Sequence, residues 1–461
     1  MRFLFSSSRA TQAGIGIIVG YTAYTSYVHL RTTYEISERE RKKQFESDLE
    51  NLKNHSWPSH QFRPMVVGGK YVNPFPEYRP QTVYEFIFCR IYELFQERPR
   101  GGVPTDLDEI RRSLPARRPD FELLLQTSRD YQNLRHNKDE INNANQTNET
   151  DEGLPPVADR LTLTWMGQSC AFVQMAGLNV LTDPCFGKHL VSPYLGPKRI
   201  SPPPCQLAEL PKVDLVLVSH DHPDHLELET VAEIGNSAMW IVPTGVGKHL
   251  ESAGVEREQY RELTWWQTMP LPGTDARDGW EIACTPAMHW SGRKMLDANT
   301  TLWCSFVVLR HGKPMFFHAG DTGYSYPLFA GIRRVFGAGC KVAMVPCGAY
   351  TPRWHLRSQH TNPQEAVQIM KDLAARKLVG VHWGTFVLSE EHFLEPRDLL
   401  HSLAAREKRS QDIVAPEFGR TLVFNLADKS DAADDATEPT EPDTALDQVR
   451  PIRNGNALLF D

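Results

Sequence analysis

The sequence predicts a layered α/β fold with a metal site at the ends of its strands, and three observations support this. Short apolar runs rich in β-branched residues, such as Val213 to Ser219, suit strands that are covered on both faces. Several of these runs end in histidine or aspartate beside a turn former, and ligands in layered α/β proteins gather at the carboxyl ends of strands. The span from about 157 to 426 also has the size expected of one large layered domain.

The clearest candidate site is the run from His220 to His225, which closes the first of these strands. Its pattern His-x-His-x-Asp-His presents four side chains of ligand type from one loop: His220, His222, Asp224 and His225. Imidazole and carboxylate groups suit zinc and other first-row metals. A polar turn with solvated histidines is the alternative interpretation, but this spacing at a strand end favours metal. So many ligands in one loop predict two neighbouring ions.

Three further ligand candidates each stand just past a predicted strand. His289 follows Glu281 to Thr285, Asp321 follows Pro314 to Phe317, and His382 follows Leu378 to Val381. Taken singly, such a histidine is more often structural, and an aspartate before Thr-Gly is usually a turn residue. Because the same arrangement of strand and ligand recurs three times, the sequence favours metal binding.

These residues resemble a known family. The ordered set is similar to the metallo-β-lactamase superfamily, and it consists of Thr182-Asp183-Pro184, the run His220 to His225, His289, Asp321 and His382. Longer stretches resemble the group of N-acylphosphatidylethanolamine-hydrolysing phospholipases D: Tyr71 to Pro76, Gly196 to Arg199, Ser358 to Pro363, His382 to Phe386 and Leu394 to Pro396. The match extends from about Gly69 to Leu426, with an interruption near residues 136 to 156. It implies a four-layer αββα sandwich with metals at the edge between its two sheets.

The resemblance also implies two zinc ions as cofactors. One zinc is expected on His220, His222 and His289, and the other on Asp224, His225 and His382. Asp321 would bridge the two ions, so Asp224 and Asp321 are expected to act in catalysis. Relatives usually have histidine where Gln168 follows Gly167 in this chain. That departure puts the hydrogen bonding around the ligands in doubt and leaves the ligands intact.

A two-metal centre suits the hydrolysis of a phosphodiester. Two divalent ions roughly 3.5 to 4 Å apart can share a water and lower its pKa toward ~7. The resemblance implies that the bridging hydroxide attacks phosphorus of an N-acylphosphatidylethanolamine and releases N-acylethanolamine and phosphatidic acid. Alternatives are another hydrolase of this fold, for lactones, thioesters or RNA, and a non-catalytic membrane scaffold or di-iron redox protein. Redox relatives usually carry glutamate where His222 stands, and a scaffold would have lost ligands.

Other residues are candidates for contact with the substrate. His360 precedes a predicted helix that starts at Asn362 and Pro363, and it could bind phosphate or transfer a proton. A solvated loop histidine is the alternative. The remaining substrate contacts are expected from Tyr194 at the acyl entrance and from Lys198, Arg199 and Arg293 at the anionic headgroup. An aromatic residue in a proline-rich loop, such as Tyr194, more often serves local packing, and a solvated surface pair explains Lys198 and Arg199 equally simply.

The amino terminus predicts a membrane-associated protein. Residues 1–34 contain no acidic side chain and three arginines, a composition typical of transit peptides. Residues 13–30 are barely long enough for a membrane-anchor helix, and a cleaved secretory signal or presequence is the alternative. We expect a mitochondrial location in the inner membrane, with an endomembrane site and a cytosol-facing catalytic domain as the alternative. The spacing of Gly16 and Gly20 would fit helix pairing in a homodimer.

Composition divides the rest of the chain. We expect a basic segment at 1–12, the membrane helix at 13–30, a charged helical stalk at 31–56, an accessory segment at 57–135, a flexible insertion at 136–156, the catalytic domain at 157–426 and an acidic disordered tail at 427–461. The net charge is −7, and residues 428–448 carry eight acidic side chains against one lysine. The rest of the chain is therefore neutral overall, which argues against nucleic acid as a partner. The eight cysteines form no Cys-x-x-Cys pair, which favours reduced, buried thiols.

Overall fold

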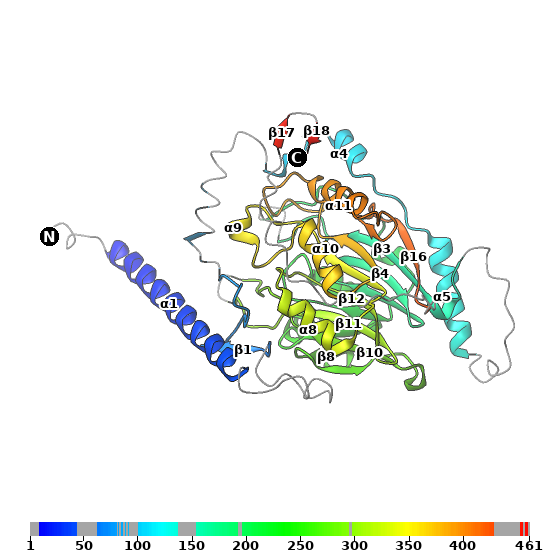
Figure 1. Ribbon diagram of the computed structural model, residues 1–461, viewed down its shortest axis with the longest axis horizontal. Coiled ribbons are helices and arrows are strands. Elements are labelled where there is room, and N and C mark those ends of the chain that lie inside the picture. Colours follow the sequence, from blue (N-terminus) through cyan, green and yellow to red (C-terminus); the bar gives the residue numbers. More distant parts are fainter. Residues whose placement is uncertain are drawn as a thin grey trace.

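Two β-sheets face each other, and helices cover their outer faces (Figure 1). The computed structural model describes residues 9–43, 62–80, 82, 84–85, 88, 91, 100–136, 154–191, 196–294, 297–427, 452–454 and 457–459. The order of layers is helix, sheet, sheet, helix. The predicted four-layer αββα sandwich is therefore confirmed.

The first sheet has seven strands in the order β16-β3-β4-β5-β6-β7-β8. Their bounds are Thr421–Asn425 (β16), Arg160–Gly167 (β3), Cys170–Met175 (β4), Leu178–Thr182 (β5), Leu215–Leu217 (β6), Met239–Pro243 (β7) and Tyr260–Leu263 (β8). The strands from β5 to β8 pair in parallel, and the others pair antiparallel. Parallel pairing places the carboxyl ends of β5 and β6 at the same edge of the sheet.

The second sheet also has seven strands, in the order β15-β14-β13-β12-β11-β10-β9. Their bounds are Ile413–Val414 (β15), Lys377–Val381 (β14), Val342–Pro346 (β13), Lys313–His318 (β12), Ser305–Arg310 (β11), Trp280–Thr285 (β10) and Thr268–Pro270 (β9). The strands from β12 to β15 pair in parallel. The predicted strands before His289, Asp321 and His382 correspond to β10, β12 and β14.

Alternation along the strands explains why the apolar runs have so few polar interruptions. Ala171 and Val173 of β4 face the core between the sheets, whereas Phe172 faces the helices on the outside. In the same way Leu217 points inward, and Val216 points outward. Successive side chains point to opposite faces of a strand, so a strand covered on both faces needs apolar residues at every position.

Helices complete the two outer layers. The first sheet is covered by α5 (Phe121–His136), α6 (Leu228–Ile234) and α7 (Gly247–Ser252), and the second by α8 (Tyr326–Phe336), α10 (Pro363–Asp372) and α11 (Glu395–Arg406). Two further helices are α4 (Leu107–Ser113) and α9 (Arg353–Leu356). Helix α10 begins as the sequence predicts: the Asn362 side chain accepts a hydrogen bond from the Glu365 amide, and the Glu365 carboxylate accepts one from the Asn362 amide.

Accessory elements precede the sandwich and pack on it. Strands β1 (Met65–Val67) and β2 (Lys70–Val72) form a hairpin. A hydrogen bond from the Tyr71 amide to the Asn299 carbonyl oxygen connects this hairpin to the sandwich. Phe75 is fully buried between Phe62 and Trp265.

Two further short strands near the carboxyl terminus, β17 (Ile452–Asn454) and β18 (Ala457–Leu459), form a separate pair.

Helix α1 (Arg9–Lys43) projects from the body beside β1 (Figure 1). It runs without a break across the boundary predicted between residues 30 and 31. Among the described residues no helix combines the length and the apolar character needed to cross a membrane. The predicted membrane span at 13–30 is therefore not supported, because polar residues such as Thr22, Thr25 and His29 interrupt its apolar stretch.

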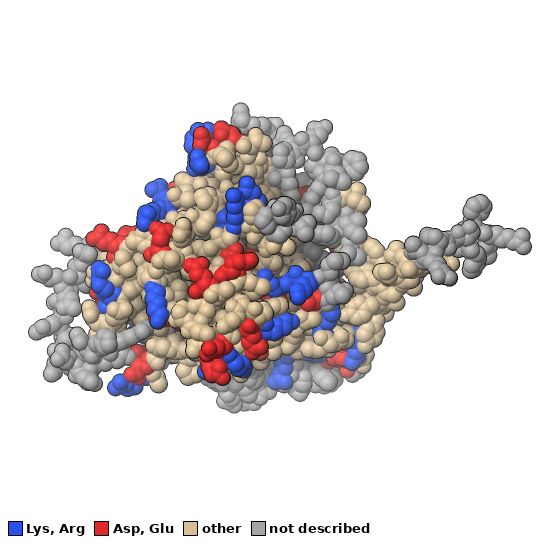
Figure 2. Space-filling model, turned by 180° about the vertical axis from the view of Figure 1, so that it is seen from behind, with Lys and Arg blue, Asp and Glu red and all other residues tan. Residues whose placement is uncertain are grey.

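Charged side chains of both signs are interspersed over the face shown in Figure 2. The seven cysteines within the described residues are all free and buried. Their state agrees with the expectation of reduced, buried thiols. The predicted insertion falls mainly on residues 137–153 and the acidic tail mainly on residues 428–451, which lie outside the described residues.

Candidate metal centre

The candidate ligands come from the carboxyl ends of four strands in the two sheets. The run His220 to His225 follows β6 of the first sheet, whereas His289, Asp321 and His382 follow β10, β12 and β14 of the second. Since the two sheets face each other, residues 157 positions apart in the chain, His225 and His382, meet at one edge of the sandwich. The structure brings all seven predicted ligands together there.

Three histidines form the first group. His220 Nε2 lies 2.8 Å from His222 Nδ1, and His289 Nε2 lies 3.3 Å from the same His222 atom. The side chains of His220 and His289 are buried. Three imidazole nitrogens at this spacing can bind one metal ion.

Two histidines and two carboxylates form the second group. Asp224 Oδ2 lies 3.6 Å from His225 Nε2 and 3.4 Å from His382 Nε2. Asp321 Oδ2 lies 3.1 Å from His225 Nε2 and 3.2 Å from His382 Nε2. The same oxygen lies 3.8 Å from His289 Nε2 of the first group. Asp321 therefore stands between the two groups, where a bridging carboxylate is expected.

The donor atoms of this centre fit metal ions. Ring nitrogens and carboxylate oxygens at such short separations repel one another unless cations or protons lie between them. The buried oxygen Asp321 Oδ1 has no hydrogen-bond partner among the described residues, which leaves it available to a cation. Imidazole and carboxylate groups are the ligand types that zinc and related metals take.

Neighbouring groups fix the orientation of the candidate ligands. His289 Nδ1 donates to the Gln359 carbonyl oxygen at 3.0 Å, and His225 Nδ1 donates to Asp183 Oδ2 at 2.8 Å. His220 Nδ1 lies 2.9 Å from Ser219 Oγ. In each of these three rings a contact fixes Nδ1, so that Nε2 faces the centre. This arrangement is usual for histidines that bind a metal.

Asp183 is the most connected of the residues around the ligands. It follows β5 directly and is fully buried. Besides the bond from His225, it accepts hydrogen bonds from the Ser219 amide and hydroxyl and from His318 Nε2. Burial opposes a negative charge there, but His318 and His225 together hold the pKa of Asp183 at about 2. Asp183 is thus an anion that positions one histidine of the second group.

Asp221 and Asn73 also position the ligand loops, and the sequence alone predicts no role for either residue. Asp221 Oδ1 accepts from the Gly292 amide at 2.7 Å and Asp221 Oδ2 accepts from Thr301 Oγ1 at 2.8 Å, so Asp221 ties the His220 loop to the His289 loop. Asn73 Nδ2 donates to the His289 carbonyl oxygen at 2.6 Å. Both belong to conspicuous motifs, but only the fold shows which loop each one holds.

The histidines of the two ligand groups differ in the direction in which their pKa values are shifted. Burial is the main cause that lowers the pKa values of His220 and His289 well below the usual range of histidine. Burial also opposes a proton on His225 and His382, but there the carboxylates of Asp321 and Asp224 prevail. They raise the pKa of His225 well above its usual range and that of His382 to about 9.

His360 also reaches the centre. Its Nδ1 lies 3.7 Å from Asp321 Oδ2, and its ring centroid lies 5.2 Å from that of His289 and 5.4 Å from that of His382. Burial is the main cause that lowers the pKa of His360 to about 4. His360 therefore lies inside the centre rather than on a solvated loop.

The structure uses two of the predicted headgroup residues to hold its own backbone. Arg199 is buried and donates to the carbonyl oxygens of Gly187, Met166 and Cys185. Arg293 Nη1 donates to the carbonyl oxygens of Asp221 and Leu226. These contacts show a structural role for both guanidinium groups, and their predicted contacts with the substrate stay predictions.

The other two predicted substrate residues, Tyr194 and Lys198, precede Arg199 in the chain. Lys198 is exposed next to Arg199, and its predicted headgroup contact is likewise untested. Tyr194 lies outside the described residues.

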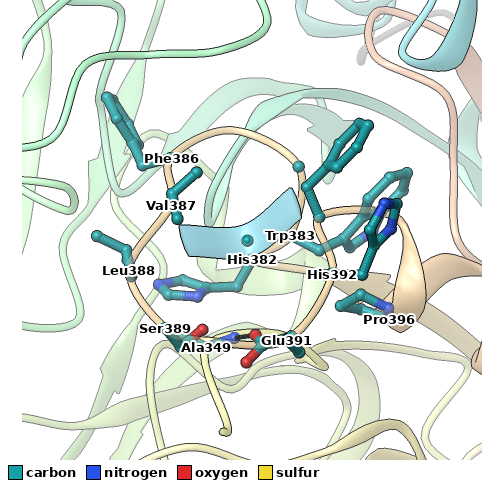
Figure 3. Close-up of a pocket in the computed structure, with 13 residues that line it drawn as sticks. Ala349, His382, Trp383, Phe386, Val387, Leu388, Ser389, Glu391, His392 and Pro396 are labelled. Carbon is teal, nitrogen blue, oxygen red and sulfur yellow. Dashed lines mark hydrogen bonds between the residues drawn. The ribbon is translucent and has the colours of Figure 1, made fainter. Parts of the chain in front are cut away.

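A narrow pocket opens beside His382 (Figure 3). Phe386, Val387 and Leu388 line it on one side, Trp383 and His392 lie on the opposite side, and Glu391 lies below. Glu391 accepts hydrogen bonds from the amides of Ala349, Tyr350 and Thr351 and so holds the loop after β13 against this segment. The enclosed volume of ≈20 Å³ has room for about one water.

The chain is similar to proteins of one superfamily. Residues 178–383 match the β-lactamase superfamily domain. The metallo hydrolase Igni18 of Ignicoccus hospitalis aligns over 58% of this chain and 100% of its own, with 22% identity and a TM-score of 0.44. The matching domain and the candidate histidine and aspartate clusters define a metallo-hydrolase of the β-lactamase superfamily.

Two curated relatives narrow this class. The mitochondrial N-acyl-phosphatidylethanolamine-hydrolyzing phospholipase D of Saccharomyces cerevisiae is 42% identical over 420 residues, which cover 89% of this chain and 87% of the relative. N-acyl-phosphatidylethanolamine-hydrolyzing phospholipase D 1 of Caenorhabditis elegans is 35% identical over 271 residues, which cover 56% and 74%. The chain belongs to the N-acyl-phosphatidylethanolamine-hydrolyzing phospholipase D family. The predicted family and the predicted enzyme class, a metal-dependent hydrolase, are confirmed.

Proposed function

We propose that this protein is a phospholipase D that binds two zinc ions and hydrolyses N-acylphosphatidylethanolamine to N-acylethanolamine and phosphatidic acid. The family relationship supports the substrate, since both curated relatives are named for this lipid. The observation that carries the proposal is the place of Asp321, whose Oδ2 lies within 3.8 Å of histidines in both ligand groups.

Each ligand group would hold one ion. His220, His222 and His289 form the first set, and Asp224, His225 and His382 the second, with Asp321 shared. When bound, two such ions lower the pKa of a shared water toward ~7 and stabilise charge on the oxygens of a phosphodiester. Asp183 keeps His225 oriented, and the Gln359 carbonyl oxygen keeps His289 oriented.

His360 is the residue of this chain best placed to act on the substrate directly. Its ring borders His289 and His382, and its Nδ1 has no hydrogen-bond partner among the described residues. Because its pKa of about 4 leaves it neutral near pH 7, its ring carries one N–H, which can donate a hydrogen bond to an anionic oxygen. We assign to His360 the contact with the phosphate or with the departing N-acylethanolamine oxygen.

We infer a mitochondrial location, and the same comparison supports it. The yeast relative is named as mitochondrial, and residues 1–34 of this chain have the acid-free, arginine-containing composition of a mitochondrial presequence. Several large apolar side chains of α1 are exposed, at 49% for Ile15, 73% for Ile17, 55% for Ile18 and 61% for Val19. We assign to this surface a contact with the mitochondrial membrane that supplies the lipid.

One assay tests the reaction. Purified protein of known metal content is incubated with N-acylphosphatidylethanolamine and, separately, with phosphatidylcholine, and the products are identified by mass spectrometry. N-acylethanolamine and phosphatidic acid are expected from the first lipid. Release of diacylglycerol, or no turnover by protein that holds two ions, would show that the proposal is wrong.

A second assay tests the location. Removal of residues 1–30 should release the protein from membranes in a flotation experiment. Unchanged flotation of the shortened chain would point to the folded body as the membrane-binding part.

A further inference from the structure

Gln168 enters the metal centre from the turn between β3 and β4. It is 1% exposed, and its backbone has the left-handed conformation with φ +50°. The preceding Gly167 has φ +116°, and a Cβ atom there would meet Arg199 Nη1 at 2.8 Å and Thr385 Oγ1 at 3.0 Å. The turn can therefore approach the end of β14 this closely only because residue 167 has no side chain.

Hydrogen bonds hold the backbone of Gln168 on both sides. Its amide donates to Thr385 Oγ1 at 2.8 Å. Its carbonyl oxygen accepts from Trp165 Nε1 at 2.7 Å and from the His382 amide at 3.0 Å. An unfavourable left-handed conformation persists only where the surroundings determine it, and these three bonds do so. The side chain is thereby directed toward the second ligand group.

The carboxamide of Gln168 stands among the candidate ligand atoms. Its Nε2 lies 2.8 Å from Asp224 Oδ2 and 3.1 Å from His382 Nε2. The ligand atoms of that group are themselves 3.1 to 3.6 Å apart. The amide nitrogen is thus as close to two candidate ligands as they are to each other, and a carboxylate oxygen is its nearest acceptor.

We propose that Gln168 is a positioning residue for the second metal ion: its amide N–H donates to Asp224 and holds that carboxylate in the orientation required of a ligand. This inference depends on the proposed two-metal function. A neutral donor suits the place, because a carboxylate would repel Asp224 and Asp321, and an apolar side chain would leave Asp224 Oδ2 without this bond. Groups that orient ligating carboxylates typically change metal affinity 10–100-fold when they are removed.

The test uses zinc-loaded full-length protein and measures each ion rather than turnover. Affinities are obtained by competition with a chromophoric chelator, and the ions retained after dialysis are counted by mass spectrometry. In Gln168→Met, which removes the amide and keeps the length of the side chain, one ion should bind about 10–100-fold more weakly. The other ion should bind as in the wild type.

Three more variants complete the design. Gln168→His retains an N–H donor and should restore most of the affinity. Gln168→Glu places a carboxylate against Asp224 and should weaken the same ion at least as much as Gln168→Met. The matched control is Gln174→Met in β4, which also removes a fully buried amide but contacts Leu124, Ser128 and Asn179 instead of the ligands. Both ions should be retained in this control.

Two outcomes overturn the inference. Wild-type affinity for both ions in Gln168→Met would show that the side chain only fills space. Tighter binding in Gln168→Glu would show that an oxygen at this position ligates the ion directly. Failure of the proposed function is distinguishable, because wild-type protein that binds two ions but releases neither expected lipid product would leave the result for Gln168 unchanged.

Discussion

Zinc binding should release protons from the second ligand group and almost none from the first. In the second group, the carboxylates of Asp321 and Asp224 overcome the effect of burial and raise the pKa values of His225 and His382, the latter to about 9. In the first group, burial is the main cause of the lowered pKa values of His220 and His289. A histidine must be neutral at the nitrogen that binds a metal, so only the second group has protons to lose near pH 7.

The size of this effect follows from the pKa values. A group with a pKa of about 9 is ~99% protonated at pH 7, and the two histidines titrate as a pair, so we expect between one and two protons to leave. Each released proton makes affinity rise about tenfold per pH unit, which is ~1.4 kcal/mol. The affinity of the second group should therefore increase about 10- to 100-fold per unit between pH 6.5 and about 8.5. It falls as the pH drops, since the raised pKa keeps the protons bound.

Calorimetry can separate the two groups. Zinc is titrated into metal-free His222→Ala, which retains the second group, and into metal-free Asp224→Ala, which retains the first. Heats measured in buffers of different ionisation enthalpy give the number of protons released. Equal release from the two variants, or none from His222→Ala, would refute the electrostatic reasoning.

Three further predictions concern single residues. Asp321→Asn should lose at least about 100-fold in turnover and should bind both ions more weakly, because its Oδ2 lies between the groups; near-normal turnover with unchanged metal content would contradict the assignment. His360→Ala should lower kcat about 10²- to 10⁴-fold while metal analysis still finds both ions, and an unchanged kcat would remove His360 from the reaction. Burial raises the pKa of Asp372, which accepts hydrogen bonds from Tyr324 and Gln368, to about 6. The folded protein therefore keeps a proton that the unfolded chain releases near pH 4, so up to about 3 kcal/mol of stability should be lost as pH rises from about 4 to 6. Urea unfolding of the wild type and Asp372→Asn over this range should differ by that loss, and parallel curves would contradict it.

Local chemistry made the ligands visible in the sequence. The strands before His220, Asp321 and His382 are short, largely apolar runs, and the strand before His289 alternates. A residue of ligand type follows each strand within four positions. The start of α10 was equally predictable, because Asn362, Pro363 and Glu365 satisfy the free amides of its first turn within four residues. These signals need no knowledge of contacts that are distant in the chain.

The membrane span was the weakest of the sequence predictions. Residues 13–30 do belong to a helix, as the pattern indicates, but that helix continues to Lys43. Its apolar residues are interrupted by threonine, serine and histidine. Helix propensity and hydropathy are separate properties. The helix propensity of this segment is sufficient for a helix, but its hydropathy is too low for a membrane span.

The sequence by itself determined the candidate ligands and the type of fold, because strand periodicity and ligand chemistry are encoded in adjacent residues. Only the tertiary structure decided how those ligands are grouped and held. Asp321 lies between the groups, Asn73 holds the His289 loop, and Gln168 reaches Asp224 from the turn between β3 and β4. It also decided that Arg199 and Arg293 bind backbone carbonyls, since a basic residue in a sequence has the same appearance whether it points to a ligand or to its own chain. Such roles depend on contacts between residues far apart in the chain, and the facing of two sheets creates those contacts.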